Sequence, residues 1–175
     1  MRGLAGHHTK TPNDPFATRR MNLANLLSSD RILPDLQATE HWPAIVELVD
    51  YLDQHGQMVG ADKDAILQLL KEREEKISTG IGYGVAIPHA FSESIESVVA
   101  GFARSKEGVE FGAIDNIPVN FIILFLVPKD QYQLHLKTLA AIAKMFNNAD
   151  IRQELADAQS ATDILATFAK RPSRT

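Results

Sequence analysis

Apolar residues recur at helical spacing in the first part of the chain and predict two consecutive amphipathic helices. The first helix ends before Gly56, and its apolar residues lie three or four positions apart: Ile45, Leu48, Val49 and Leu52. The second begins near Asp62, whose negative charge suits a helix N-terminus. Its apolar face leads into a charged run at residues 71–76 and consists of Ile66, Leu69 and Leu70.

Strand-like patterns precede and follow these helices. Residues 35–39 predict a short strand, after which Thr39 can cap the first helix. Residues 98–104 and 119–127 predict two longer strands, separated by a turn at residues 111–116. The second of these strands is apolar on both faces, which is typical of a central strand covered by helices.

The last part of the chain returns to helical periodicity. We expect one helix at residues 131–147 and a pair of short helices within residues 150–170, where Ser160 and Asp163 form a variant of the capping box. Helices before and after several strands predict an α/β domain. The expected architecture is a three-layer α-β-α sandwich with a central mixed β-sheet flanked by helices.

The composition fits one domain with a hydrophobic core, since 45% of the 175 residues are hydrophobic and 23% are charged. The longest apolar run, residues 121–127, is much shorter than the roughly 20 residues of a membrane-spanning helix. We therefore expect a soluble protein without direct membrane insertion. The chain has no cysteine, which excludes disulfides, thiolate metal sites and a cysteine nucleophile and is consistent with a cytoplasmic location.

Charge divides the chain into a basic start and an acidic remainder. Residues 1–20 contain four basic residues and one acidic residue, a net charge of +3, whereas residues 21–175 contain 14 basic and 21 acidic residues, a net charge of −7. Because the start has no apolar stretch of about 7 to 15 residues, it is not a secretory signal. We expect a disordered leader or an added segment at residues 1–20, one domain at residues 21–170 and a tail at residues 171–175. The acidic domain argues against a nucleic acid partner.

The segment most informative about chemistry is residues 78–90, STGIGYGVAIPHA, where three alternating glycines precede Pro88 and His89. Glycine accepts backbone angles that are barred to other residues and lets another group approach the main chain. The segment therefore predicts a shaped loop that presents the imidazole of His89 at a surface. The plainer interpretation is that the glycines form an ordinary turn.

Two polar residues lie on helical faces that are otherwise apolar. Arg73 continues the buried face of the second helix, where a guanidinium needs an anion. His135 shares its face with three apolar residues, Leu139, Ile142 and Phe146. The plainer interpretations are a core histidine with satisfied hydrogen bonds and an arginine that pairs with a carboxylate. Lys137 points away from the face of His135 and is left out of the site.

Motifs for nucleotide phosphates are absent from the sequence. The GxGxG spacing does not match the dinucleotide fingerprint, and no GxxxxGK[ST] loop occurs. If this chain handles phosphate, a phosphorylated protein is therefore a more natural donor than a nucleoside triphosphate.

Four segments, in this order, resemble the fructose/mannitol-type (type 2) IIA domain of the bacterial phosphoenolpyruvate-dependent phosphotransferase system, and within it the nitrogen-regulatory IIA proteins. The resemblance spans residues 21–170. The segments that carry it are Glu72-Arg-Glu74, residues 78–89, residues 111–119 and His135-Leu-Lys-Thr-Leu139.

The resemblance implies a phosphocarrier, that is, a phosphotransferase without a cofactor or a metal. It implies that His89 accepts a phosphoryl group on its tele nitrogen from the phosphohistidine of HPr or of its nitrogen-branch counterpart. Arg73 is then expected to clamp the phosphate, and His135 to stabilise it as a neighbouring imidazole. These roles fit the chemistry, because a neutral imidazole is a good nucleophile and phosphoryl transfer depends on alignment and on neutralised charge. Further candidate contacts to the phosphate are Thr79, Gly80, Gly82 and Gly84.

Two outputs of such a phosphocarrier remain open. Sugar transport requires a IIB component with an acceptor cysteine and a membrane IIC component, and a cysteine-free chain of 175 residues contains neither. They would be separate polypeptides. The length and residues 111–128 are more similar to nitrogen-regulatory IIA proteins. We therefore expect a regulatory role, in which phosphorylation alters binding to regulatory or transport proteins.

Two interpretations from other classes are kept as alternatives. His89, His135 and Asp115 could form the metal site of a hydrolase, although their spacing matches no local metal motif. A degenerate family member that only binds partners is the other alternative, against which the retention of His89, Arg73 and His135 together argues. The remaining histidines receive no role: His7 and His8 lie in the leader, and His41 and His55 are expected to be solvated residues at the ends of the first helix.

Overall fold

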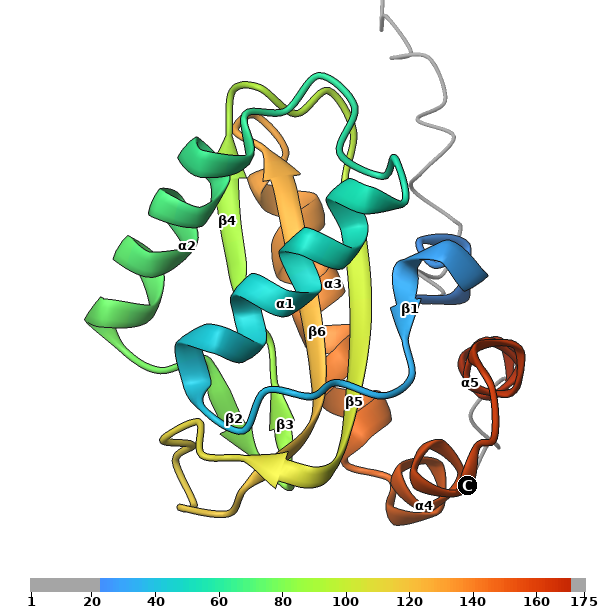
Figure 1. Cartoon of the computed structure of the whole chain (residues 1–175). Helices are drawn as coiled ribbons and strands as arrows, with labels where there is room; N and C mark the ends of the chain where they lie inside the picture. Colours follow the sequence, from blue (N-terminus) through green and yellow to red (C-terminus); the bar gives the residue numbers. More distant parts are fainter. Residues whose placement is uncertain (1–22, 171–175) are drawn as a thin grey trace, which may run out of the picture.

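A mixed β-sheet forms the middle layer of the structure (Figure 1). The computed structural model describes residues 23–170, so the predicted leader at residues 1–20 and the tail at residues 171–175 lie outside the described residues. Within residues 23–170 the sheet has six strands: β1 (Ile32–Leu33), β2 (Gly80–Gly82), β3 (Val85–Ala86), β4 (His89–Ser92), β5 (Val99–Val109) and β6 (Val119–Pro128).

The order of the strands brings distant parts of the chain together around β6. The strands β5 and β6 are antiparallel neighbours, and β1 pairs in parallel with the other side of β5. On its free side, β6 pairs in parallel first with β3 and then with β4. The sheet ends at β2, which is antiparallel to β3. The predicted central mixed sheet is therefore confirmed.

Helices cover both faces of this sheet (Figure 1). One layer consists of α1 (His41–Gln54) and α2 (Lys63–Lys76). The other layer consists of α3 (Tyr132–Phe146), α4 (Ala149–Asp157) and α5 (Ala161–Ala169). Two short 3-10 turns from the beginning of the described chain, η1 (Leu23–Asn25) and η2 (Ser29–Arg31), also belong to this layer. This arrangement confirms the predicted three-layer α-β-α sandwich.

The strand β6 separates two hydrophobic cores, as its continuous apolar sequence predicts. Side chains alternate between the two faces of a strand. Toward α1 and α2, β6 contributes Val119, Ile122, Leu124 and Leu126. Toward α3, α4 and α5 it contributes Phe121, Ile123, Phe125 and Val127. The sequence of β6 is continuously apolar because both of its faces are buried in a hydrophobic core.

The two predicted helices in the first half of the chain are confirmed. The four apolar residues predicted on α1 are fully buried, and Gly56, with φ of 67°, follows the end of the helix. Asp62 caps α2 by accepting a hydrogen bond from the N–H of Ala65. The helix α2 continues through the charged run to Lys76. Arg73 therefore lies in its last turn.

The predicted strand at residues 35–39 is wrong, and so is the predicted cap at Thr39. The strand in this region is β1, which ends before Pro34. In residues 35–39 the N–H of Leu36 donates to the carbonyl of Arg104 on β5, but the next two N–H groups, of Gln37 and Ala38, donate to the carboxylate of Glu47 on α1. The residue before α1 is Glu40, whose side chain makes no capping hydrogen bond. Thr39 instead accepts a hydrogen bond at its carbonyl from the N–H of Glu110.

The later elements match the predictions except at their ends. The strand β5 continues to Val109, five residues beyond the predicted end, and the loop after it contains the predicted turn at residues 111–116. The helix α3 lies within the predicted range, and α4 and α5 form the predicted pair. Ser160 caps α5 through the N–H of Asp163, whose carboxylate accepts from the N–H of Gln159.

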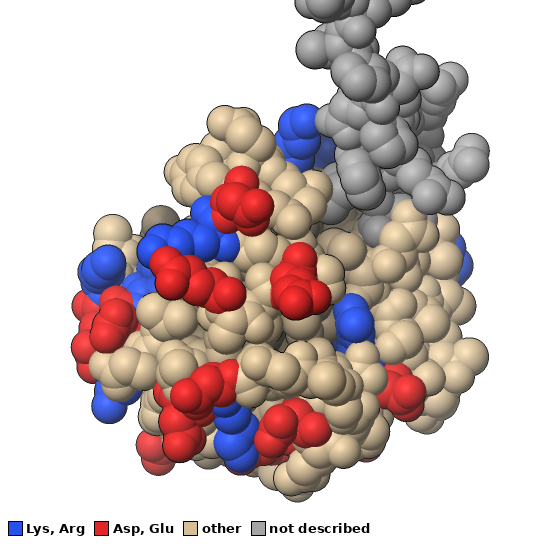
Figure 2. Space-filling model, turned by 90° about the horizontal axis from the view of Figure 1, so that it is seen from above, with Lys and Arg blue, Asp and Glu red and all other residues tan. Residues whose placement is uncertain are grey.

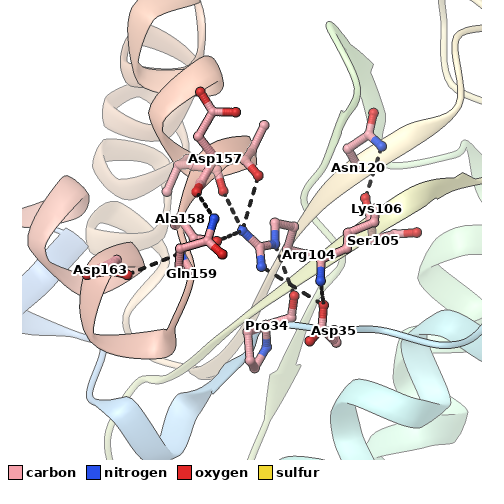
Figure 3. A network of polar contacts seen from close by, with 12 residues as sticks. Pro34, Asp35, Arg104, Ser105, Lys106, Asn120, Asp157, Ala158, Gln159 and Asp163 are labelled. Atoms are coloured by element: carbon pink, nitrogen blue, oxygen red, sulfur yellow. Dashed lines mark hydrogen bonds and ion pairs between the residues drawn. The ribbon is translucent and has the colours of Figure 1, made fainter.

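Arg104 of β5 attaches the C-terminal helices to the sheet (Figure 3). Its side chain is buried, and its guanidinium donates hydrogen bonds to the carbonyls of Pro34, at 3.0 Å, and Ala158, at 2.5 Å. It also reaches the carbonyls of Leu155 and Ala156 in the last turn of α4, where carbonyls lack partners within the helix. A positive charge is favourable at this end of a helix. The residue therefore has a structural role.

Acidic and basic side chains are interspersed on the face seen from above in Figure 2. Some charged side chains of the described surface form ion pairs: Lys63 lies 3.0 Å from a carboxylate oxygen of Asp50 and 3.7 Å from one of Asp53. No continuous basic surface is visible on this face. Among the helices of residues 23–170, none has both the length and the apolar character needed to cross a membrane.

Candidate functional site

His89 is the first residue of β4, at an edge of the sheet. The strands β3 and β4 lie end to end along β6, with Ile87 and Pro88 between them. The carbonyl of Pro88 accepts a hydrogen bond from the N–H of Phe125, while proline has no N–H to donate. This interruption places His89 between the layer that contains α2 and the layer that contains α3.

The glycine-rich segment is a β-hairpin rather than an irregular loop. The strands β2 and β3 are its two arms, and its turn has positive φ at Gly82 (95°), Tyr83 (56°) and Gly84 (73°). Glycine is the residue that adopts such angles without strain. Gly80 is required for a different reason, because a Cβ there would lie 2.7 Å from Ala113. The glycines therefore shape the segment that leads to His89.

Two hydrogen bonds define the tautomer of His89. Its Nδ1 lies 2.9 Å from the carbonyl of Ile87, which can only accept, so Nδ1 carries the proton. Its Nε2 lies 3.3 Å from Nε of Arg73, which can only donate, so Nε2 carries the lone pair. The nucleophilic nitrogen of the ring is therefore Nε2.

Arg73 reaches His89 from the last turn of α2. Its Nη1 donates a hydrogen bond of 2.7 Å to the carbonyl of Ile77, which fixes the guanidinium beside the imidazole. The side chain is half-buried. As the sequence predicts, Arg73 continues the buried face of α2, and it places a permanent positive charge next to Nε2.

His135 reaches the same place from α3. Its ring centre lies 4.6 Å from that of His89, and its ring packs in a T-shaped arrangement with that of Phe91. The side chain is only 4% exposed, and its Nδ1 has no hydrogen-bond partner among the described residues. Such an atom is costly to bury, so His135 has a hydrogen-bonding capacity that no described residue uses.

The environment keeps both imidazoles neutral at pH 7. Burial is the main cause that lowers the pKa of His89 below 6.5; the hydrogen bond to Ile87 opposes this effect, and the charge of Arg73 adds to it. Burial, followed by repulsion from His89 and Arg73, lowers the pKa of His135 to about 4. A neutral imidazole is the form that can act as a nucleophile.

Thr79 lies close to this site but does not face it. Both its N–H and its hydroxyl donate to the carboxylate of Glu74. Gly80 donates its N–H to the hydroxyl of Ser78. The predicted phosphate contacts of Thr79 and of the glycines at 80, 82 and 84 therefore stay predictions, for which the structure supplies another role.

Sequence reasoning missed Glu74 and misjudged His41. Glu74 is buried, four residues after Leu70 and eight after Ile66, so helical spacing alone could have placed it on the inner face of α2. His41, expected to be solvated, lies with Nε2 2.9 Å from a carboxylate oxygen of Glu74, and its ring packs against that of Phe111 at a tilt of 36°. His55 is exposed, as expected.

Of the three residues suggested for a metal site, His89 and His135 lie together, but Asp115 does not complete a metal site with them. Asp115 accepts hydrogen bonds from the N–H groups of Tyr83 and Ile117, at the tip of the β2–β3 hairpin. Within residues 23–170, no group of three or more histidines and carboxylates could hold a metal ion. The geometry therefore does not support the hydrolase alternative.

The depressed pKa of His135 predicts that stability falls as the pH is lowered from about 6.5 to about 4. In this window the unfolded chain binds a proton at this residue and the folded chain does not, so protonation favours unfolding. The expected loss from His135 is about 2 kcal/mol. Urea unfolding at several pH values, with wild type and His135→Gln, measures it as the difference between the two proteins. Parallel pH profiles would contradict the prediction.

Comparison with known proteins finds a described family that matches most of this chain. The profile of the family described as "Phosphoenolpyruvate-dependent sugar phosphotransferase system, EIIA 2" matches residues 25–171. A "Nitrogen regulatory protein" of Bradyrhizobium diazoefficiens is 31% identical over 153 residues, which cover 87% of this chain and 98% of that protein. A "PTS system fructose-specific EIIA component" of Haloferax volcanii is 38% identical over 108 residues, which cover 60% and 70%.

The fold is similar to that of a solved structure with a related description. The crystal structure of the nitrogen regulatory protein IIA-Ntr from Neisseria meningitidis superposes with a TM-score of 0.77 at 28% sequence identity. The match covers 84% of this chain and 99% of that one. The sequence comparison and the fold comparison thus both relate this chain to IIA proteins.

Proposed function

The chain belongs to the EIIA 2 family of the phosphoenolpyruvate-dependent sugar phosphotransferase system, and from this premise we propose that it carries a phosphoryl group on Nε2 of His89. As an EIIA domain it is a phosphotransfer component of that system. The observation that carries the proposal is the tautomer of His89, whose Nε2 bears the lone pair beside the guanidinium of Arg73.

In the proposed reaction, Nε2 of His89 attacks the phosphorus of a phosphohistidine on the donor protein. A bond forms between Nε2 and phosphorus, and the bond between phosphorus and the donor nitrogen breaks. Positive charge develops on the imidazole of His89 as it attacks. The carbonyl of Ile87, which accepts from Nδ1–H at 2.9 Å, stabilises this charge and keeps the ring in place.

Arg73 and His135 are proposed to bind the phosphoryl oxygens. The incoming group displaces the 3.3 Å hydrogen bond from Arg73 to Nε2, and the guanidinium then donates to a phosphoryl oxygen. His135 is neutral at pH 7 and has a ring nitrogen without a partner among the described residues, which suits a hydrogen bond to the same group. Charge on the transferred group is thus neutralised where it develops.

Exposed apolar residues next to the site support a protein as the donor. Ile77 is 74% exposed and follows α2 beside Arg73, and Tyr132 and Leu136 are 54% and 44% exposed on α3 beside His135. Large apolar side chains at a surface favour protein contacts. We propose HPr or its nitrogen-branch counterpart as the partner that binds here, in the cytoplasm.

A regulatory output is favoured over sugar transport. The nitrogen regulatory relative from Bradyrhizobium matches over nearly its whole length, whereas the fructose-specific relative matches over 70% of its length. Phosphorylation adds up to two negative charges beside the apolar residues, which changes the partners that can bind. In the alternative, the phosphoryl group passes to a cysteine of a separate IIB component, since this chain has no cysteine.

A comparison of phosphoryl donors tests the proposal. The chain is incubated with phosphoenolpyruvate and either enzyme I with HPr or their nitrogen-branch counterparts. We expect an acid-labile, base-stable label that forms faster with the nitrogen-branch proteins. Faster labelling by HPr would favour the transport alternative, and no label with either donor would overturn the phosphocarrier proposal.

A further inference from the structure

Glu74 is a buried carboxylate beside the site to which the proposed phosphoryl transfer assigns no role. It is 8% exposed and lies directly after Arg73 on α2. Its two oxygens accept hydrogen bonds from the N–H and the hydroxyl of Thr79, and one of them, Oε2, lies 2.9 Å from Nε2 of His41. A buried charge with several partners is usually held for structure or for function.

Hydrogen bonds connect Glu74 to the imidazole of His89 through two backbone residues. Thr79 is held by Glu74 at its N–H, and its carbonyl accepts a hydrogen bond of 3.0 Å from the N–H of Ile87. The carbonyl of Ile87 in turn accepts from Nδ1 of His89 at 2.9 Å. A continuous chain of hydrogen bonds therefore links Glu74 to the carbonyl that accepts from Nδ1–H of His89.

His41 fixes Glu74 from a second helix. It is the first residue of α1, and its ring packs against that of Phe111 with the ring centres 3.9 Å apart. The contact between His41 and Glu74 spans 33 positions of sequence. Glu74 is thereby held between α1, its own helix α2 and the start of β2.

Arg73 also helps to hold the segment between α2 and β2. The guanidinium of Arg73 donates to the carbonyl of Ile77, and Glu74 accepts from the N–H of Thr79, so adjacent residues of α2 fix both ends of the segment that leads into β2. Removing the carboxylate would leave a buried N–H and hydroxyl without their acceptor. The segment would then move to find new partners, and Ile87 would move with it.

We propose that Glu74, held by His41, is a positioning residue that sets the orientation and tautomer of His89 through Thr79 and Ile87. The inference rests on the proposed function of His89 and deepens it. Glu74 does not contact the reacting atoms. It acts by keeping Nε2 of His89 as the atom with the lone pair, in line with the donor and beside Arg73. A misplacement of about 1 Å at a reacting group costs on the order of 100-fold in rate.

The experiment compares Glu74→Ala and Glu74→Gln with wild type in the full chain. Long-range nitrogen–proton NMR spectra of uniformly ¹⁵N-labelled protein report which nitrogen of His89 carries the proton. We expect wild type to show the Nδ1–H tautomer and Glu74→Ala to show a mixture of tautomers. The kcat of phosphoryl transfer from the carrier should fall about 10- to 100-fold, with a smaller change in KM, because positioning and not binding is lost.

Two further variants keep the result interpretable. Glu75→Gln removes the same charge from the next residue of α2, which is exposed, and should leave the His89 signals and the transfer rate unchanged. His41→Gln should shift the His89 signals in the same direction as Glu74→Ala, but to a smaller extent. If Glu74→Ala does not fold, His41→Gln tests the proposal in its place. Urea unfolding of each variant separates loss of stability from loss of orientation.

The proposal is overturned if the Glu74 and His41 variants keep the His89 signals and the transfer rate of wild type. It is equally overturned if their stability falls while the tautomer of His89 stays the same, because Glu74 would then be structural only. The NMR readout requires no phosphoryl donor. Failure of wild type to become labelled would therefore overturn the proposed function, whereas unchanged His89 signals would overturn the role of Glu74.

Discussion

Replacing His89 with glutamine is expected to abolish phosphorylation of the chain. Glutamine is similar in length and polarity, but its amide nitrogen has no lone pair available for attack on phosphorus. The rate of acid-labile labelling from phosphoenolpyruvate through enzyme I and the carrier should fall by about 10³-fold or more. Gel-based labelling followed by acid and base treatment measures this loss.

The matched control is His55→Gln, since His55 is an exposed histidine at the end of α1 and takes no part in the site. This variant should be labelled at the rate of wild type. Far-UV circular dichroism of both variants verifies that they fold. Labelling of His89→Gln at the wild-type rate would show that another residue accepts the phosphoryl group.

Replacing Arg73 with methionine should slow phosphoryl transfer by about 10²- to 10³-fold. Methionine keeps an unbranched side chain at this half-buried position, and it removes the guanidinium that contacts Nε2 of His89 and the carbonyl of Ile77. The loss comes from charge on the phosphoryl oxygens that is no longer neutralised as the bond to the donor breaks. Rapid-quench measurement of a single transfer from the phosphorylated carrier gives the rate.

A second cation of α2 provides the control for Arg73. Lys76 is exposed three residues further along the helix, so Lys76→Met removes the same charge without removing a contact to His89. It should change the rate by less than about threefold, mainly through weaker long-range attraction. Arg73→Lys should recover part of the rate, since it restores the charge but not the planar guanidinium. Equal rates for Arg73→Met and Lys76→Met would remove Arg73 from the mechanism.

Periodicity was sufficient to place Arg73 and His135 because each lies in a helix with a clear apolar face. Their spacing from Ile66 and Ile142 determines the side of the helix on which they lie, and helical geometry holds regardless of the rest of the fold. The same argument predicted β6, whose apolar residues face two cores. In these elements, local pattern and tertiary burial agree.

The predicted strand at residues 35–39 failed because local pattern does not specify a hydrogen-bond partner. The N–H groups of Gln37 and Ala38 bind the side chain of Glu47, which comes after them on α1. The true strand, β1, has only two residues and pairs with Phe102 and Ala103 about 70 positions away. Strand pairing between distant segments is a property of the folded chain, so a short window of sequence cannot contain it.

The conformation of the glycine-rich segment was predicted in part from the sequence and in part required the tertiary structure. Its composition predicted a shaped backbone that presents His89, and positive φ at Gly82 and Gly84 gives the physical reason. That it is a hairpin, with β3 in line with β4 along β6, follows only from the sheet.

The sequence by itself determined the two apolar helix faces that carry Arg73 and His135, the central strand and the segment that ends at His89. These follow from periodicity and from the backbone angles that each residue allows. Only the tertiary structure decided that Arg73 and His135 meet His89, that Nε2 of His89 has the lone pair, and that His41 holds Glu74. These depend on distances between segments far apart in the chain, which are set when two layers of helices pack on one sheet.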